Sequence, residues 1–129
     1  RINHRRGRTA DGEKIYSLAD VYQQADLVTY PSAIEGFGNA FLEALYYRRP
    51  IVTHMYSVFK TDILTKGFKV IHFTDYLDEA TVQAVRDLLQ DAEAVAEMVE
   101  HNFELGKHHY SYRTLRRRLV ALLDEALEA

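Results

Sequence analysis

The stretch YPSAIEGFGNAFLEALYYR, residues 30–48, decides how this chain is expected to fold. The apolar run LVTY, residues 27–30, is rich in residues that favour a β-strand. Pro31 ends that strand, because proline cannot donate to a strand ladder. Gly36 and Gly38 then form a short loop, and apolar residues recur at helical spacing directly after it. The order strand, glycine loop, helix directs free backbone N–H groups toward an anion.

Two carboxylates frame this turn, with Glu35 in the loop and Glu43 one turn inside the expected helix. The N-terminus of a helix carries partial positive charge and unpaired N–H donors, which suit a phosphate. Glycines let a ligand approach the backbone, and carboxylates accept hydrogen bonds from sugar hydroxyls. The combination indicates a ligand with both phosphate and sugar hydroxyls. The alternative is a plain strand-to-helix turn with two solvated glutamates.

Glu35, the Gly-Phe-Gly loop and Glu43, eight residues after Glu35, resemble the E-x7-E signature of GT-B glycosyltransferases of the family-4 type, the glycosyl transferases group 1. The similarity extends upstream through ADLV at residues 25–28 and downstream through RPIV at residues 49–52. The resemblance implies an α/β fold with a Rossmann-like three-layer parallel sheet. It would be the later part of a GT-B C-terminal domain, which binds the nucleotide-sugar donor.

The resemblance also implies roles for single residues. Glu35 would be the catalytic residue and contact hydroxyls of the donor sugar, whereas Glu43 would contact the ribose. No cofactor and no metal are expected, because cationic side chains and a helix dipole take over the charge of the leaving diphosphate in this fold. Backbone N–H groups from Phe37 to Ala40 would face the sugar and the diphosphate. The donor-binding residues implied in this way are Gly36, Phe37, Gly38, Asn39, Ala40 and Glu43.

The resemblance covers nearly the whole chain but only the later part of the family's donor domain. Family members carry a Gly-Arg and a Lys for the diphosphate further upstream, and before them an acceptor-binding domain. Neither is seen here, and the surroundings of Arg5, Arg6 and Arg8 do not match that motif. We therefore expect residues 1–129, which begin with Arg1 rather than Met, to form a single incomplete domain that is inactive alone. Its exposed sheet edge would favour self-association.

The acceptor is indicated only by a finer resemblance. Gly38-Asn39-Ala40, the pair Tyr46-Tyr47 and parts of residues 56–68 resemble a branch that makes small glycosides such as glucosylglycerate-type solutes. The parent would then be a retaining hexosyltransferase acting on a sugar or small glycoside. A non-catalytic nucleotide- or sugar-binding module and a GT-B epimerase or phosphorylase remain open as alternatives.

Composition excludes several other classes of function. A net charge of −3 over 129 residues argues against a nucleic-acid binder that neutralises phosphates. The absence of cysteine excludes disulfides, thiolate catalysis and cysteine zinc sites, and it fits a cytoplasmic location. No apolar run reaches the length of a transmembrane segment.

The remaining elements follow from local signals. Residues 1–14 are polar and basic and predict a loop, followed by a helix over residues 18–24 with Ser17 as its cap. Strands are expected at residues 26–30, 51–53 and 68–73. Asp78 should cap the next helix, and Gly106 should close the one after it. In the last helix, which Ser111 can cap, the residues expected to face inward are Leu115, Leu119, Leu122 and Ala126.

Other residues carry weaker signals. Six histidines include the group His101, His108 and His109, whose spacing matches no recognised metal-ligand set, so surface positions are expected. His54 follows the second strand at its carboxyl end and could face a ligand or only position a loop. Tyr46 and Tyr47 should pack the central helix against the sheet. Tyr56 and Phe59 could line the donor pocket.

Overall fold

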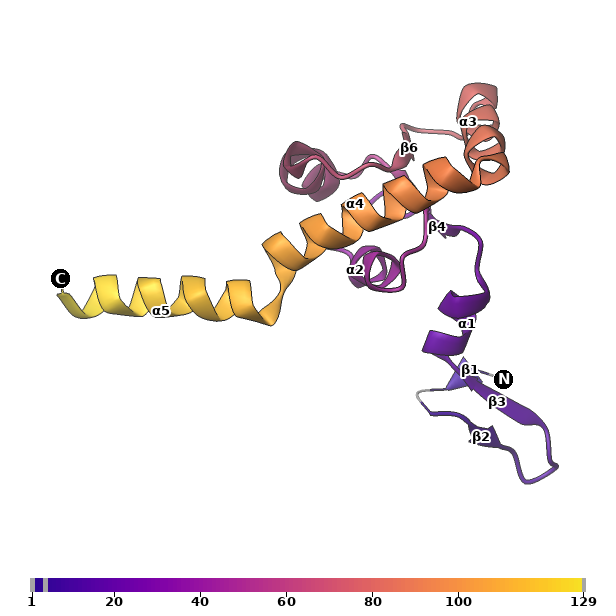
Figure 1. Ribbon diagram of the computed structural model, residues 1–129, viewed down its shortest axis with the longest axis horizontal. Coiled ribbons are helices and arrows are strands. Elements are labelled where there is room, and N and C mark those ends of the chain that lie inside the picture. Colours follow the sequence, from indigo (N-terminus) through magenta and orange to yellow (C-terminus); the bar gives the residue numbers. More distant parts are fainter. Residues whose placement is uncertain (1, 4, 129) are drawn as a thin grey trace.

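The computed structural model describes residues 2–3 and 5–128, and it arranges them around a small parallel sheet flanked by helices (Figure 1). This sheet has the strand order β4 (Val28–Tyr30), β5 (Ile51–His54), β6 (Ile71–Phe73), and both neighbouring pairs are parallel. The expected α/β class with a parallel sheet is thus confirmed. Each strand is short, so the stability of the sheet depends on the helices that cover it.

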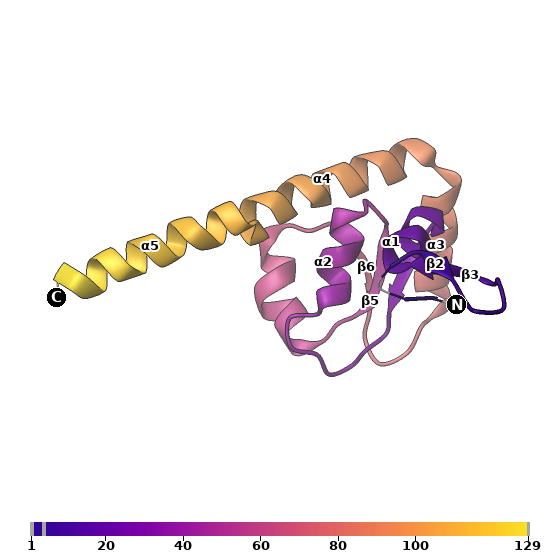
Figure 2. The same cartoon turned by 90° about the horizontal axis from the view of Figure 1, so that it is seen from below.

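Helical segments connect the parallel strands. Helix α2 (Asn39–Tyr46) joins β4 to β5 and completes the expected β–α–β unit. A π-helical turn, η1 (Phe59–Ile63), and a 3-10 turn, η2 (Leu64–Lys66), join β5 to β6. After β6 the chain is helical, and in Figure 2 α4 runs beside α2 while α5 continues outward from the body. These helices are α3 (Glu79–Gln90), α4 (Ala92–Tyr110) and α5 (Tyr112–Glu128).

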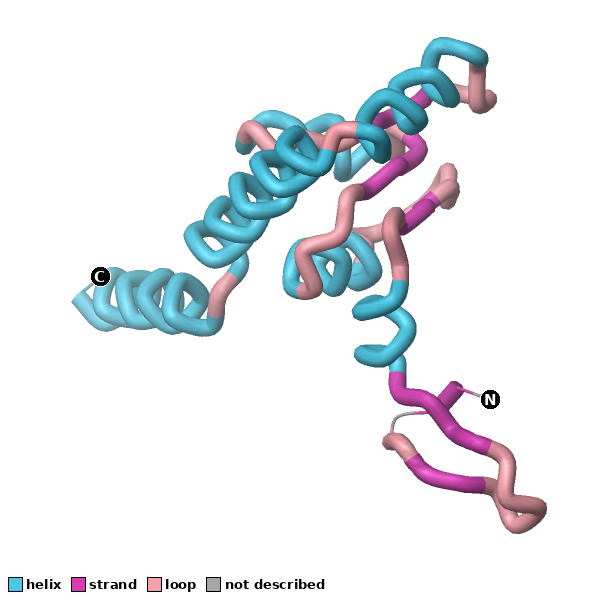
Figure 3. The backbone as a smooth tube through the Cα atoms, turned by 45° about the vertical axis from the view of Figure 1, so that its right-hand side comes forward, coloured by secondary structure: helices cyan, strands magenta, loops and turns pink. Residues whose placement is uncertain are grey.

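The basic N-terminal region is not the loop that its composition predicts. It contains β1 (Ile2–Asn3), β2 (Gly7–Arg8) and β3 (Lys14–Ser17), which form a second sheet of order β1-β3-β2. Strand β2 is exposed at both of its residues, and β3 alternates between exposed and half-buried residues over only four positions, a run too short to detect from the sequence. This sheet extends away from the rest of the molecule, and α1 (Leu18–Gln24) connects it to the body (Figure 3).

The caps expected for three helices are confirmed. The Ser17 side chain accepts from the backbone N–H of Asp20, whose carboxylate accepts from the Ser17 backbone in return. Asp78 accepts from the N–H of Thr81 at the start of α3. Ser111 accepts from the N–H of Thr114 at 3.3 Å at the start of α5.

Gly106 does not end a helix, which corrects the expectation from sequence. It lies inside α4, which continues to Tyr110. A Cβ at this position would come within 3.2 Å of the Leu45 side chain of α2. The glycine therefore allows α4 to approach α2 closely, and its φ is not in the left-handed region that a glycine helix stop requires.

Helix α5 also differs from expectation, because its apolar face is not turned inward. Leu115, Leu119 and Leu122 are each more than half exposed, and α5 projects beyond the body in Figures 1 and 2. The side chain of Ala126, expected on the same face, lies outside the described residues. The helical period correctly predicted an amphipathic helix, but the described chain provides no neighbour to cover it. No described helix is long and apolar enough to span a membrane.

The hydrophobic core lies between α2, the middle strand and the η1–η2 segment. Phe41 of α2 is its centre and packs edge-on against Phe59 and Phe68, with ring centroids 6.2 and 5.3 Å away. Phe59 belongs to this core and does not line a pocket, which corrects one expectation. The buried apolar residues of the cluster are Tyr22, Phe41, Ala44, Leu45, Ile51, Tyr56, Phe59, Ile63 and Phe68.

Candidate functional site

The glycine loop begins at the edge of the sheet where parallel strands end. Strands β4, β5 and β6 run in the same direction, so their carboxyl ends share this edge, where open α/β sheets bind ligands. The hydroxyl of Thr53, a buried residue of β5, donates to the carbonyl of Tyr30 at 3.1 Å. This bond holds the end of β4 in place just before the loop leaves it.

Gly38 is the N-cap of α2 and needs to be glycine for two reasons. Its φ of 88° lies in the left-handed region, which side chains with a Cβ rarely adopt. In addition, a Cβ there would lie 3.0 Å from the hydroxyl oxygen of Tyr56 and 3.1 Å from that of Tyr30. Gly36 differs, because a Cβ at its position would meet no atom within 4 Å. Tyrosine side chains therefore pack closely against the loop at Gly38, whereas the space beside Gly36 is open.

The N-terminus of α2 is free of the side-chain caps that satisfy the other helices. Ser17, Asp78 and Asp91 each accept a backbone N–H at the start of α1, α3 and α4. Within residues 2–3 and 5–128, no side chain does this for α2. Its first N–H groups and the positive end of its dipole thus remain available to an anionic ligand.

Tyr56 fixes the glycine loop from the core side. Its hydroxyl donates to the carbonyl of Phe37 at 3.0 Å, and its side chain is 2% exposed. Burial raises the pKa of Tyr56 to about 12, with smaller contributions from Tyr30 and Glu35. Tyr56 therefore does not line the pocket as expected but holds the loop in position. Sequence spacing offers no signal for this role, because Tyr56 lies 19 residues from Phe37.

Glu35 lies half-buried next to Tyr30, the last residue of β4. Burial raises the pKa of Tyr30, and hydrogen bonding to the Glu35 carboxylate raises it further. The Tyr30 ring in turn meets Tyr56 edge-on, with centroids 6.1 Å apart. The carboxylate expected to serve catalysis is thus positioned at the sheet edge beside the tyrosines that hold the loop.

Glu43 lies half-buried on α2 and contacts a residue that sequence reasoning did not select. Its Oε2 accepts a hydrogen bond from the Tyr22 hydroxyl of α1 at 2.9 Å. The Tyr22 ring stacks on Tyr47, with centroids 4.9 Å apart. Tyr47 packs as part of this stack, but Tyr46 is 67% exposed, so the expectation that Tyr46 packs against the sheet is wrong.

The remaining implied donor-binding residues surround the same helix start. Asn39 and Ala40 form its first turn, and Phe37 lies edge-on against Tyr110 at 4.9 Å. A cavity of about 440 Å³ lies between the loop and the α4–α5 junction. Its lining residues include Phe37, Asn39, Leu42, Tyr110, Thr114 and Arg118.

One histidine, His109, also lines this cavity. His54 ends β5, and its buried Nδ1 has no hydrogen-bond partner in the described part of the chain. His101 instead lies 2.8 Å from the carbonyl of Gly67 through its Nε2. Among the described residues, no three His, Asp or Glu side chains gather in a way that could hold a metal ion.

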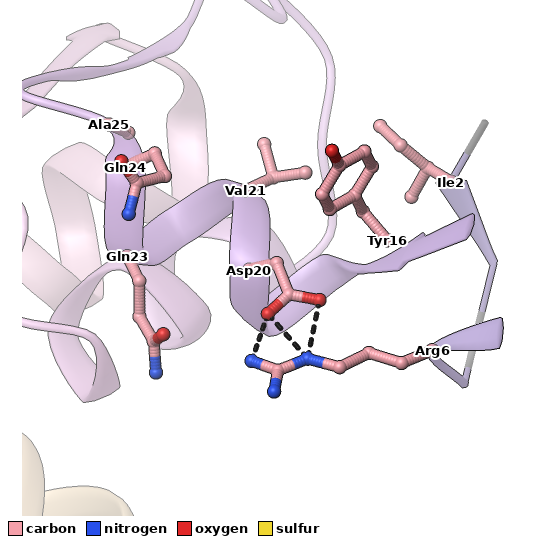
Figure 4. Close-up of a pocket in the computed structure, with 8 residues that line it drawn as sticks. All are labelled: Ile2, Arg6, Tyr16, Asp20, Val21, Gln23, Gln24 and Ala25. Atoms are coloured by element: carbon pink, nitrogen blue, oxygen red, sulfur yellow. Dashed lines mark hydrogen bonds and ion pairs between the residues drawn. The ribbon is translucent and has the colours of Figure 1, made fainter. Parts of the chain in front are cut away.

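A second cavity, of about 840 Å³, lies between α1 and the N-terminal strands (Figure 4). Its main polar feature is the ion pair of Arg6 and Asp20, in which the Arg6 Nε lies 2.7 and 2.9 Å from the two carboxylate oxygens. Asp20 also closes the cap of α1 with Ser17. These two charged groups therefore satisfy one another, and the other polar side chains in the lining are those of Tyr16, Gln23 and Gln24.

Residues 13–104 match the sequence family described as Glycosyl transferases group 1. The chain belongs to this family. The match begins at β3, includes the glycine loop with Glu35 and Glu43, and ends within α4. The fold described above is the α/β arrangement expected for part of a GT-B domain of this glycosyltransferase family.

Two proteins that are similar in sequence to this chain are mannosylglucosylglycerate synthases. The protein from Thermotoga maritima is 41% identical over 108 residues, which cover 74% of this chain and 25% of the relative. The protein from Petrotoga mobilis is 51% identical over 59 residues, which cover 46% of this chain and 14% of the relative. The aligned region spans about a quarter, or less, of the length of these relatives.

Proposed function

We propose that this chain forms the donor-binding part of a retaining glycosyltransferase that transfers a sugar from a nucleotide sugar to an acceptor. The observation that carries the proposal is the uncapped N-terminus of α2, which stands at the ligand-binding edge of the sheet between Glu35 and Glu43. An uncapped helix start suits a diphosphate, and flanking carboxylates suit hydroxyl groups on either side of it. A nucleotide sugar contains both kinds of group.

In this proposal each part of the site meets one part of the donor. Glu35 acts as the catalytic residue and contacts hydroxyls of the sugar, while Glu43 contacts the ribose. The backbone N–H groups of Phe37, Gly38, Asn39 and Ala40 face the sugar and the diphosphate. The open space beside Gly36 supports this arrangement, because a ligand can approach the backbone there without meeting a side chain.

The acceptor in this proposal is a small glycoside, such as a glucosylglycerate-type solute. The names of the two relatives support this choice. Because the aligned region is about a quarter of the Thermotoga maritima protein, we further propose that residues 1–129 are an incomplete donor domain. The acceptor would then bind to a domain outside this chain, and the complete enzyme would carry both.

The proposal is tested by ligand binding and by product analysis on the complete enzyme. A panel of UDP-, GDP- and ADP-sugars is screened for an increase in melting temperature, since a ligand that binds only the folded state stabilises it. The stabilising donor is then incubated with glucosylglycerate. We expect a new glycoside and a free nucleoside diphosphate. A phosphorylase would instead require orthophosphate, an epimerase would release an isomeric sugar, and a binding module would give no product.

A further inference from the structure

Glu43 is not free to rotate in this structure, because a buried tyrosine of another element holds one of its oxygens. The Tyr22 hydroxyl donates to Glu43 Oε2 at 2.9 Å across 21 residues of sequence. Tyr22 is 8% exposed, so its position is set by packing. The bond therefore links α1, outside the strand–loop–helix motif, to the carboxylate inside it.

The tyrosine is itself held on its other face. Its ring stacks on Tyr47 with centroids 4.9 Å apart and planes 12° apart, and Tyr47 is the C-cap residue of α2. Burial, and to a smaller extent the hydrogen bond to the Glu43 carboxylate, raises the pKa of Tyr22 to about 12. The hydroxyl therefore remains a donor at neutral pH. Tyr22, Glu43 and Tyr47 thus form a fixed set at the junction of α1 and α2.

This bond leaves most of the acceptor capacity of Glu43 unused. A carboxylate has about four acceptor positions on two oxygens, and Tyr22 occupies one of them on Oε2. The other oxygen is then presented in a defined direction. A glutamate that is already oriented loses less side-chain entropy when it binds a ligand hydroxyl.

We infer that Tyr22 is a positioning residue for recognition of the nucleotide ribose, which it serves by orienting Glu43. This inference rests on the proposed function, since it needs Glu43 to contact ribose hydroxyls. Tyr22 itself need not touch the ligand. Its effect is confined to ligands that use the oriented carboxylate, and this distinguishes positioning from a general contribution to folding.

The test compares ribose with deoxyribose ligands on the complete polypeptide that carries this chain. UDP, GDP and ADP are titrated first, and the diphosphate that binds most tightly is compared with its 2′-deoxy and 3′-deoxy forms. The variants are Tyr22→Phe, Glu43→Gln and the pair combined. Tyr46→Phe is the matched control, because it removes a hydroxyl from an exposed tyrosine of α2, the helix that carries Glu43.

We expect Tyr22→Phe to weaken the ribonucleotide about three- to tenfold, the range for one lost hydrogen bond, and to leave the affinity for one deoxy form nearly unchanged. The preference for ribose should therefore shrink. The double variant should lose no more than Glu43→Gln alone, and Tyr46→Phe should match the unaltered protein. Tyr47→Leu, which removes the stacking ring but keeps the Tyr22 hydroxyl, should reduce the same preference partly.

The experiment distinguishes failure of the Tyr22 inference from failure of the proposed function. If Glu43→Gln reduces the ribose preference and Tyr22→Phe does not, the positioning role of Tyr22 is wrong while the proposed function stands. If no diphosphate binds, or Glu43→Gln retains the full preference, the proposed function is wrong and the inference fails with it. Should Tyr22→Phe not fold, an unchanged ribose preference in Tyr47→Leu would overturn the inference.

Discussion

At the scale of single residues, both the backbone conformation and the packing at position 38 require a glycine. Its φ of 88° and the 3.0–3.1 Å approach of the Tyr56 and Tyr30 side chains each disfavour a Cβ. A left-handed conformation costs a residue with a side chain about 1–2 kcal/mol. Forcing a methyl group into this packed position costs a further ~1–3 kcal/mol.

Gly38→Ala should therefore destabilise the fold by about 2–5 kcal/mol, measured by urea denaturation. Gly36→Ala is the matched control, because a Cβ there meets no atom within 4 Å and its φ lies outside the left-handed region. It should leave stability nearly unchanged. If both substitutions cost the same, packing under Gly38 does not determine the loop.

Glu35 and Glu43 are assigned different parts of the donor, and substitution can separate them. In the complete enzyme, Glu35→Gln should chiefly lower kcat, because contacts to the sugar strengthen as charge develops at the anomeric carbon. Glu43→Gln should weaken the free nucleoside diphosphate by about 1.5–3 kcal/mol, the loss of a charged hydrogen bond. Titration of both variants with the nucleoside diphosphate alone tests this assignment. A larger loss at Glu35 would mean that the donor lies the other way round.

At the scale of elements, one amide side chain ties α4 to the segment that leads into β6. Asn102 is 1% exposed. Its Oδ1 accepts from the backbone N–H of Lys69 at 2.8 Å, and its Nδ2 donates to the carbonyl of Lys69 at 2.6 Å. The side chain thus pairs with both backbone groups of one residue, much as a neighbouring strand would.

Removing this amide leaves two polar backbone groups of Lys69 without their partners. Asn102→Ala should destabilise the protein by about 1–3 kcal/mol, because it removes two part-buried hydrogen bonds that contribute about 0.5–1.5 kcal/mol each. Gln90→Ala, at the exposed end of α3, is the control and should change the unfolding midpoint little. A small effect of Asn102→Ala would show that water replaces the amide and that α4 is held by apolar packing alone.

At the scale of the whole molecule, the exposed surfaces bear on what the chain can do alone. Strands β4 and β6 are the edges of the central sheet, and α5 presents an apolar face. We expect residues 1–129 expressed alone to fold, to self-associate in sedimentation experiments and to transfer no sugar to glucosylglycerate. Detectable transfer by this chain alone would contradict the proposal that it is an incomplete donor domain.

The charge of the diphosphate is a second property of the whole site. The sequence contains no Asp-x-Asp pair that could hold a metal-bound diphosphate. In the complete enzyme, donor affinity measured by calorimetry should therefore be unchanged in excess EDTA. Loss of binding in EDTA that magnesium or manganese restores would contradict this prediction.

Features that depend on near neighbours along the chain could be predicted from the sequence. Caps at Ser17 and Asp78, the β–α–β order and the glycine loop between Glu35 and Glu43 follow from residues a few positions apart. Such features rest on backbone sterics and local hydrogen bonds, which a short stretch specifies. For the same reason the E-x7-E resemblance was enough to predict the family.

The tertiary structure alone decided which distant side chains meet. The Tyr22–Glu43 bond, the Tyr56 bond to the loop and the contact of Gly106 with Leu45 join residues 19 or more positions apart. Sequence patterns also misjudged α5, because an amphipathic period shows that a helix has an apolar face but not whether anything covers it. Long-range packing depends on how elements are placed in space, and periodicity within one element carries no information about that placement.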